Sequence, residues 1–82
     1  MPHYYFHLRH DSQLIIDDEG QDFPDENAAR AEAAKSVHEI LGEVIRSNHD
    51  DVPEAMVVVD EDGREVASVP FADAVPAELK AR

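Results

Sequence analysis

The chain has 82 residues and a formal net charge of −12, because 7 lysines and arginines stand against 19 aspartates and glutamates, and it contains no cysteine. A chain of this length forms one domain with a modest core, and without cysteine it has neither disulfides nor thiolate metal sites. Phosphate groups and anionic lipids repel so acidic a chain, and no basic patch offsets the repulsion. We therefore expect no nucleic acid and no membrane among its partners. The longest apolar run, residues 55–59, is too short for a membrane span or a signal peptide, which favours a cytoplasmic protein.

The first predicted element is a strand over residues 3–10, in which aromatic and aliphatic residues alternate with polar ones. This period of two is typical of a half-buried strand. One face would carry Tyr4, Phe6 and Leu8, and the other His3, Tyr5, His7 and Arg9. A turn at residues 11–12 leads to a second predicted strand over residues 13–17. We expect the two strands to pair as a hairpin, with Leu14 and Ile16 facing the helix.

A single long helical pattern covers residues 25–47. At about 100° per residue, its apolar side chains fall on one stripe. The stripe contains Ala29, Ala33, Val37, Ile40, Leu41 and Val44. Pro24 disfavours a helical conformation for the residue before it, and Asp25 can accept the amide hydrogens of the first turn as the N-cap. The helix is therefore predicted to begin at Asp25 or one residue later, and to end near Ser47.

Two more strands are predicted after the helix. Residues 54–60 are rich in valine, residues 62–63 are the hairpin signal Asp-Gly, and residues 64–69 form the returning strand. Pro70 cannot donate to a sheet ladder, so the last strand should end or lie at an edge there. Phe71 is expected to fold back onto the core.

This order of elements predicts an α+β domain with a two-layer ββαββ architecture. A right-handed crossover from the second strand to the third leaves room for the first strand between them. The predicted sheet is therefore mainly antiparallel, has the spatial order 2-1-3-4 and carries the helix on one face. Residues 1–75 are expected to form this single domain, and residues 76–82 a short C-terminal tail open to fraying.

The most acidic segment of the chain is residues 17–26. It is a candidate binding site for a ligand or metal ion. Aligning Gly20 with the glycine of a calcium loop places Asp17, Glu19 and Glu26 at ligand positions. Ile15 occupies the first position, where that loop requires a carboxylate. Loop and hairpin turns explain this segment better, so ligand or metal-ion binding by it is kept only as the alternative.

The five histidines are read as polar surface residues and predict no metal site. His3 and His7 share a strand face but lie about 13 Å apart at roughly 3.4 Å per residue. His10 faces the other way, and His38 and His49 have no ligand partner four residues on. The serines stand in no nucleophile motif, and three scattered glycines make no phosphate cradle. We expect a non-catalytic protein without a cofactor.

Five short segments together resemble a known family. They are YYFHLR at 4–9, DEG at 18–20, FPD at 23–25, AARAEA at 28–33 and VPFAD at 69–73. In these segments the chain resembles a family of short bacterial proteins classed as a domain of unknown function, over about residues 2 to 75. The resemblance implies a small α+β domain in a bacterial cytoplasm and brings no established activity, cofactor or site residue. The chain departs from the family at His10-Asp11, where many members have an acid and a glycine.

The sheet face opposite the predicted helix is the main candidate surface. It would carry Tyr5, His7 and Arg9, together with alternate residues of the valine-rich strand. Edge strands of so small a sheet can also pair between chains. The sequence therefore predicts a protein-interaction or regulatory module that self-associates through its open sheet face or an edge strand, with a protein partner or a homodimer as the expected assembly.

Overall fold

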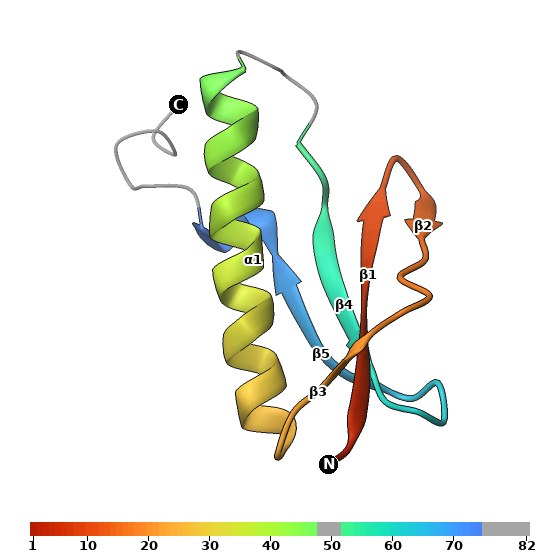
Figure 1. The fold of residues 1–82 in the computed structure, drawn as a ribbon. Helices are drawn as coiled ribbons and strands as arrows, with labels where there is room; N and C mark the ends of the chain where they lie inside the picture. Colours follow the sequence, from red (N-terminus) through yellow and green to blue (C-terminus); the bar gives the residue numbers. More distant parts are fainter. Residues whose placement is uncertain (48–51, 75–82) are drawn as a thin grey trace.

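The structure is a computed structural model that describes residues 1–47 and 52–74, so the predicted tail at 76–82 lies outside the described residues. Along the chain the elements are β1 (His3–His10), β2 (Gln13–Ile15), β3 (Gln21–Asp22), α1 (Glu26–Arg46), β4 (Ala55–Val59), β5 (Glu65–Pro70) and the 3-10 helix η1 (Phe71–Ala74) (Figure 1). No helix of the described residues is long and apolar enough to cross a membrane.

The main sheet has the strand order β2-β1-β4-β5, and every neighbouring pair is antiparallel. This order confirms the α+β class. It also confirms the predicted spatial order 2-1-3-4, because the four predicted strands correspond to β1, β2, β4 and β5. The sequence did not predict β3, which pairs with the start of β1 through His3↔Asp22 and Tyr4↔Gln21. The sheet therefore has five strands.

The β1–β2 hairpin corrects the predicted orientation of Leu14. Leu14 lies opposite Arg9, and Ile15 lies opposite Leu8. Because directly paired residues share a face, Ile15 is on the helix side and Leu14 on the open side. Ile16 follows β2 and is 59% exposed, so it does not pack under the helix either. The prediction for both residues was wrong because a two-residue turn sets the register of the hairpin, and a shift of one residue reverses every face.

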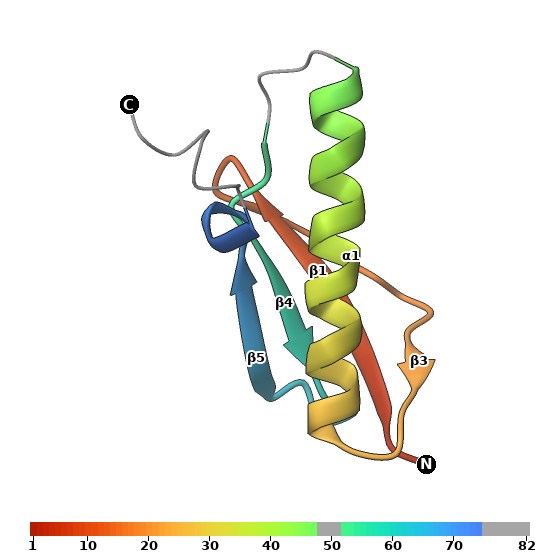
Figure 2. The ribbon, with the colours of Figure 1, turned by 90° about the vertical axis from the view of Figure 1, so that its left-hand side faces the viewer.

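Helix α1 begins where the sequence predicted. Asp25 is the N-cap, and its carboxylate accepts a hydrogen bond from the Ala28 N–H at 2.9 Å. The buried stripe consists of Ala29, Ala33, Val37 and Leu41. The helix packs on one face of the sheet, against β4, β5 and η1 (Figure 2). Alanine allows close approach in the first half of this contact because its side chain is a single methyl group.

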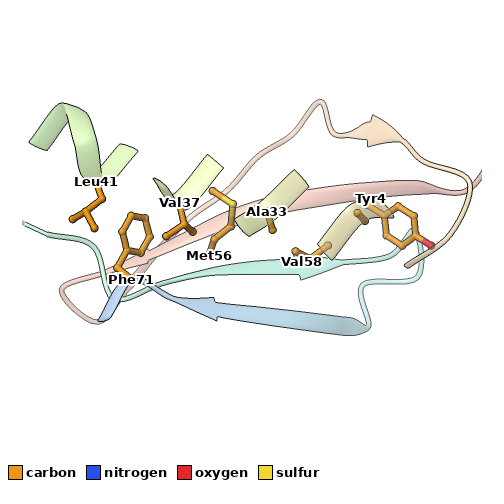
Figure 3. Close-up of a cluster of buried hydrophobic side chains, with 8 residues drawn as sticks. Tyr4, Ala33, Val37, Leu41, Met56, Val58 and Phe71 are labelled. Carbon is orange, nitrogen blue, oxygen red and sulfur yellow. The ribbon is translucent and has the colours of Figure 1, made fainter. Parts of the chain in front are cut away.

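The core lies between α1 and the sheet. Figure 3 shows Tyr4, Ala33, Val37, Leu41, Met56, Val58 and Phe71 in a row between the helix and the sheet, with Ala33, Val37 and Leu41 coming from the helix itself. Phe71 is 1% exposed and its N–H donates to the Glu54 carbonyl at 3.0 Å, so it folds back as predicted. Burial of such a side chain stabilises the fold by about 1.5–3 kcal/mol.

Candidate interaction surface

The structure brings Tyr5, His7 and Arg9 together on one face of β1. Their partners on β4 are Val59, Val57 and Ala55. The alternate β1 residues Phe6 and Leu8 pack against the core, so the three predicted surface residues point away from α1. We call this the open sheet face, and it extends across β4 to Ser68 and Pro70 of β5. Its role as an interaction surface stays a prediction.

Three rings form a row along this face of β1. The rings of His3 and Tyr5 meet edge to face with centroids 5.0 Å apart, and those of Tyr5 and His7 stack at 6.4 Å with an interplanar angle of 27°. Val57 is only 3% exposed, although it lies on the same face, opposite His7. The accessible part of the open sheet face therefore consists of half-buried rings and the exposed Arg9 side chain on β1, together with the exposed Ser68 and Pro70 on β5.

His7 is held in place by the loop that follows β2. The backbone N–H of Asp17 donates to His7 Nδ1 at 3.1 Å. Because Nδ1 accepts this hydrogen bond it carries no proton, so the geometry assigns the ring proton to Nε2. The ring consequently has a fixed orientation and one remaining donor.

The Asp17 side chain fills a gap at the edge of the sheet. It accepts hydrogen bonds from the N–H groups of Phe6 at 3.0 Å and of Glu19 and Gly20 at 3.2 Å each. Partial burial acts to raise the pKa of the Asp17 carboxyl. The backbone N–H donors, led by that of Phe6, outweigh burial and hold this pKa below its usual value.

His3 clamps the same loop to the start of β1. Its Nδ1 lies 2.5 Å from Asp22 Oδ1 and its Nε2 lies 2.7 Å from the Glu19 carbonyl oxygen. Both partners are acceptors, so the geometry fits a ring that carries a proton on each nitrogen. The hydrogen bond to Asp22, followed by that to the Glu19 carbonyl, raises the pKa of His3 above its usual value.

The three carboxylates predicted as the alternative ion-binding site do not point to one place. Asp17 directs its oxygens at backbone amides, whereas Glu19 is exposed in the loop and Glu26 is exposed in the first turn of α1. Within residues 1–47 and 52–74, no three histidine, aspartate or glutamate side chains are grouped so that they could hold a metal ion. Ion binding through Asp17, Glu19 and Glu26 stays a prediction.

The Asp62-Gly63 turn closes the β4–β5 hairpin. Asp60 accepts hydrogen bonds from the N–H groups of Asp62 at 3.0 Å and Arg64 at 2.9 Å, and it pairs with the Arg64 guanidinium at 3.2 Å. The Arg64 N–H is the largest of the causes that together hold the pKa of Asp60 below its usual value. This turn is a structural hairpin, in agreement with the prediction for residues 62–63.

Sequence reasoning missed one exposed feature, a row of three aliphatic residues in and after β2. Leu14, Ile15 and Ile16 are 41%, 54% and 59% exposed. Three consecutive apolar residues cannot all face one side of a strand, so the run itself was a usable signal. We call these three residues the aliphatic row.

A depression of about 470 Å³ lies over the C-terminal half of α1. Its described lining runs from His38 to Arg46 and comes from this helix alone. Ligand sites usually gather polar groups from several elements, so we assign it no role.

The chain belongs to the family described as Domain of unknown function (DUF6894), whose model matches residues 3–72. The match runs from the first residue of β1 into η1, and it confirms the resemblance noted in the sequence. No curated protein and no solved structure matches the chain significantly.

Proposed function

We propose that this domain is a non-catalytic protein-interaction or regulatory module of a bacterial cytoplasm, and that it self-associates through its open sheet face or an edge strand. The observation that carries the proposal is the position of α1 on one face of the sheet only, which leaves Tyr5, His7 and Arg9 on the other (Figure 2). Tyrosine and arginine are the residue types that most often anchor protein interfaces.

The side chains of this surface are already ordered. His7 is fixed by the Asp17 N–H, and Tyr5 lies between the rings of His3 and His7. Ordering a free side chain on binding costs about 0.5–1.5 kcal/mol, so pre-ordered rings lower the cost of forming an interface. This argues for a docking role of the surface rather than a purely structural one.

The test is the solution mass of the full chain, measured by light scattering behind a sizing column over a wide concentration range. The series is run in buffer, with calcium and with a chelator. A dimer that is indifferent to calcium supports the proposal. A monomer that becomes more compact only with calcium contradicts it and points to Asp17, Glu19 and Glu26 instead.

A further inference from the structure

The aliphatic row offers a more specific interface than the open sheet face does. An edge strand with exposed apolar side chains is a template for pairing with another strand, because its outer backbone groups have no partner in the sheet. Here β2 is an edge of the main sheet, and the aliphatic row is the only run of three consecutive large exposed apolar residues in the described chain.

Backbone alternation directs the polar groups of Leu14 outward. The Phe6 N–H points away from β4, to Asp17, so the even-numbered residues of β1 direct their backbone groups toward β2. Their partners Ile15 and Gln13 therefore direct their own groups back toward β1. Leu14 and, in the same alternation, Ile16 are left to present N–H and C=O groups to solvent.

The other open edges of the sheet, β5 and the part of β1 between β2 and β3, are protected against pairing. On β5, the Arg30 guanidinium donates to the Val66 carbonyl at 3.2 Å, and Pro70 has no N–H to offer. On β1, the gap between β2 and β3 is filled by the Asp17 carboxylate at the Phe6 N–H. These are the devices by which natural sheets avoid edge pairing, and β2 carries none of them except its short length.

We propose that β2 pairs antiparallel with β2 of a second copy of this chain, in the register that places Ile15 opposite the partner's Ile15 and Leu14 opposite the partner's Ile16. This inference rests on the proposed self-association and names its surface. The result is a continuous sheet through two copies, with both helices on one side of it.

The apolar and charged residues of the strand together select this register. With Ile15 opposite Ile15, the three residues of the aliphatic row pair only with one another, while Asp17 faces the partner's Gln13 and Asp18 faces the partner's Ser12. Placing Ile16 opposite Ile16 would instead set Leu14 and Ile15 against the partner's Asp18 and Asp17. The next allowed register would place Leu14 opposite Leu14 and Asp17 opposite the partner's Asp11. Like charges directly opposite one another destabilise a strand pair. A basic partner is not required, because the strip from residue 12 to residue 16 is uncharged.

A cysteine variant tests the register, since the chain has no native cysteine. In the proposed pair the two Ile15 residues face each other without direct backbone bonds, at a Cα separation of about 4.5 Å, which a disulfide can bridge. Under mild oxidation Ile15→Cys should cross-link at least about tenfold faster than Ile45→Cys, because the contact raises the effective thiol concentration. Ile45 is the matched control, with 52% exposure on α1 against 54% for Ile15. Equal rates for the two variants would overturn the register.

Charge variants test the interface by a second route. Ile15→Lys and Ile15→Glu should each weaken the dimer by about tenfold or more, because like charges then oppose each other, whereas their mixture should form a heterodimer. Native mass spectrometry with one variant isotope-labelled detects that heterodimer. As the control, Ile45→Lys should form a dimer as readily as the wild-type chain does. Circular dichroism verifies that each variant is folded.

The remaining outcomes separate this inference from the proposed function. A wild-type dimer that survives Ile15→Lys and does not cross-link at position 15 overturns the β2 interface and leaves the open sheet face as the surface of self-association. If the wild-type chain is a monomer at every accessible concentration, both the β2 pairing and the proposed self-association are overturned. Any strand that pairs with the β2 edge would then come from another protein.

Discussion

The carboxylate of Asp17 accepts a hydrogen bond from the backbone N–H of Phe6 at 3.0 Å. At this point the outer edge of β1 has no strand beside it, because β3 pairs with His3 and Tyr4 and β2 pairs with residues 8–10. A side chain therefore supplies the acceptor that a neighbouring strand would otherwise supply. The same carboxylate also orders the loop through the Glu19 and Gly20 amides.

Replacing Asp17 with alanine should lower the free energy of unfolding by about 2 kcal/mol, because three backbone donors lose their acceptor. Asp17→Asn should cost less, because its amide oxygen can still accept. Urea unfolding at pH 7 measures both. Asp18→Ala is the control and should change stability by no more than about 0.5 kcal/mol, because Asp18 is exposed. An equal loss in the Asp18 variant would contradict the special position of Asp17.

The low pKa of Asp17 also predicts acid sensitivity. Its pKa in the folded protein lies below the ordinary value of 3.8, so its contribution to stability is fully present above 3.8 and is lost as the pH falls through the folded pKa. The difference in stability between wild type and Asp17→Asn should therefore be constant from pH 7 down to about pH 5 and should shrink below pH 3.8. Urea unfolding across this range gives the difference directly, and a gap that persists unchanged into strong acid would contradict the prediction.

His3 should give the opposite dependence on pH. Its pKa is raised above 6.5, so the clamp stabilises the fold fully below pH 6.5 and loses its effect as the pH rises through the folded pKa. An NMR titration of the His3 ring should show the raised value directly. In Asp22→Asn the pKa of His3 should fall back toward 6.5, because the hydrogen bond to Asp22 is its largest cause. Glu61→Gln is the matched control, since the charge of Glu61 is only the last of these causes.

The alanine-rich helix and the four main strands could be predicted because their signals are local. The N-cap Asp25, the stripe from Ala29 to Leu41 and the Asp-Gly turn each depend on residues a few positions apart. The inward position of Phe71 could be predicted because Pro70 ends the edge strand just before it. Each of these features uses a preference that a short segment already has on its own.

The loop from Ile16 to Asp22 could not be predicted because its contacts join distant positions. Phe6 and Asp17 are 11 residues apart, and His3 and Asp22 are 19 apart. The acidity of the loop was visible in the sequence, but no pattern indicated that Asp17 would serve the backbone of β1. The orientation of Leu14 failed for a related reason, since the turn geometry, and not the apolar pattern, decides which face a hairpin residue takes.

Two glycines with positive φ should respond differently to alanine. Gly63 has φ +82 and open space around an added Cβ, so Gly63→Ala should cost only the backbone strain of about 1 kcal/mol. Gly20 has φ +68, and an added Cβ would lie 2.5 Å from the Tyr4 carbonyl oxygen and 2.6 Å from His3 Nε2. Gly20→Ala should therefore cost roughly 3 kcal/mol, because strain and overpacking add. Equal losses in urea unfolding would show that the loop moves away from β1 freely.

The β1–β2 turn should be improvable by a single substitution. Asp11 and Ser12 have φ values of 51° and 66°, so both central residues of this two-residue turn are left-handed. Hairpin turns of this kind favour glycine at the second position, because a Cβ is disfavoured in that conformation. Ser12→Gly should therefore raise the free energy of unfolding by about 0.5–1 kcal/mol, after the greater freedom of glycine in the unfolded chain is subtracted.

A matched serine supplies the control for this turn. Ser47, at the C-cap of α1, has φ −83, where a side chain is not strained, so Ser47→Gly should lower stability or leave it unchanged. For a domain of 60–100 residues, 1 kcal/mol corresponds to about 4–8 °C in Tm, so a thermal scan resolves the two variants. A Tm that falls in Ser12→Gly would mean that the Ser12 side chain stabilises the turn by more than its left-handed backbone costs.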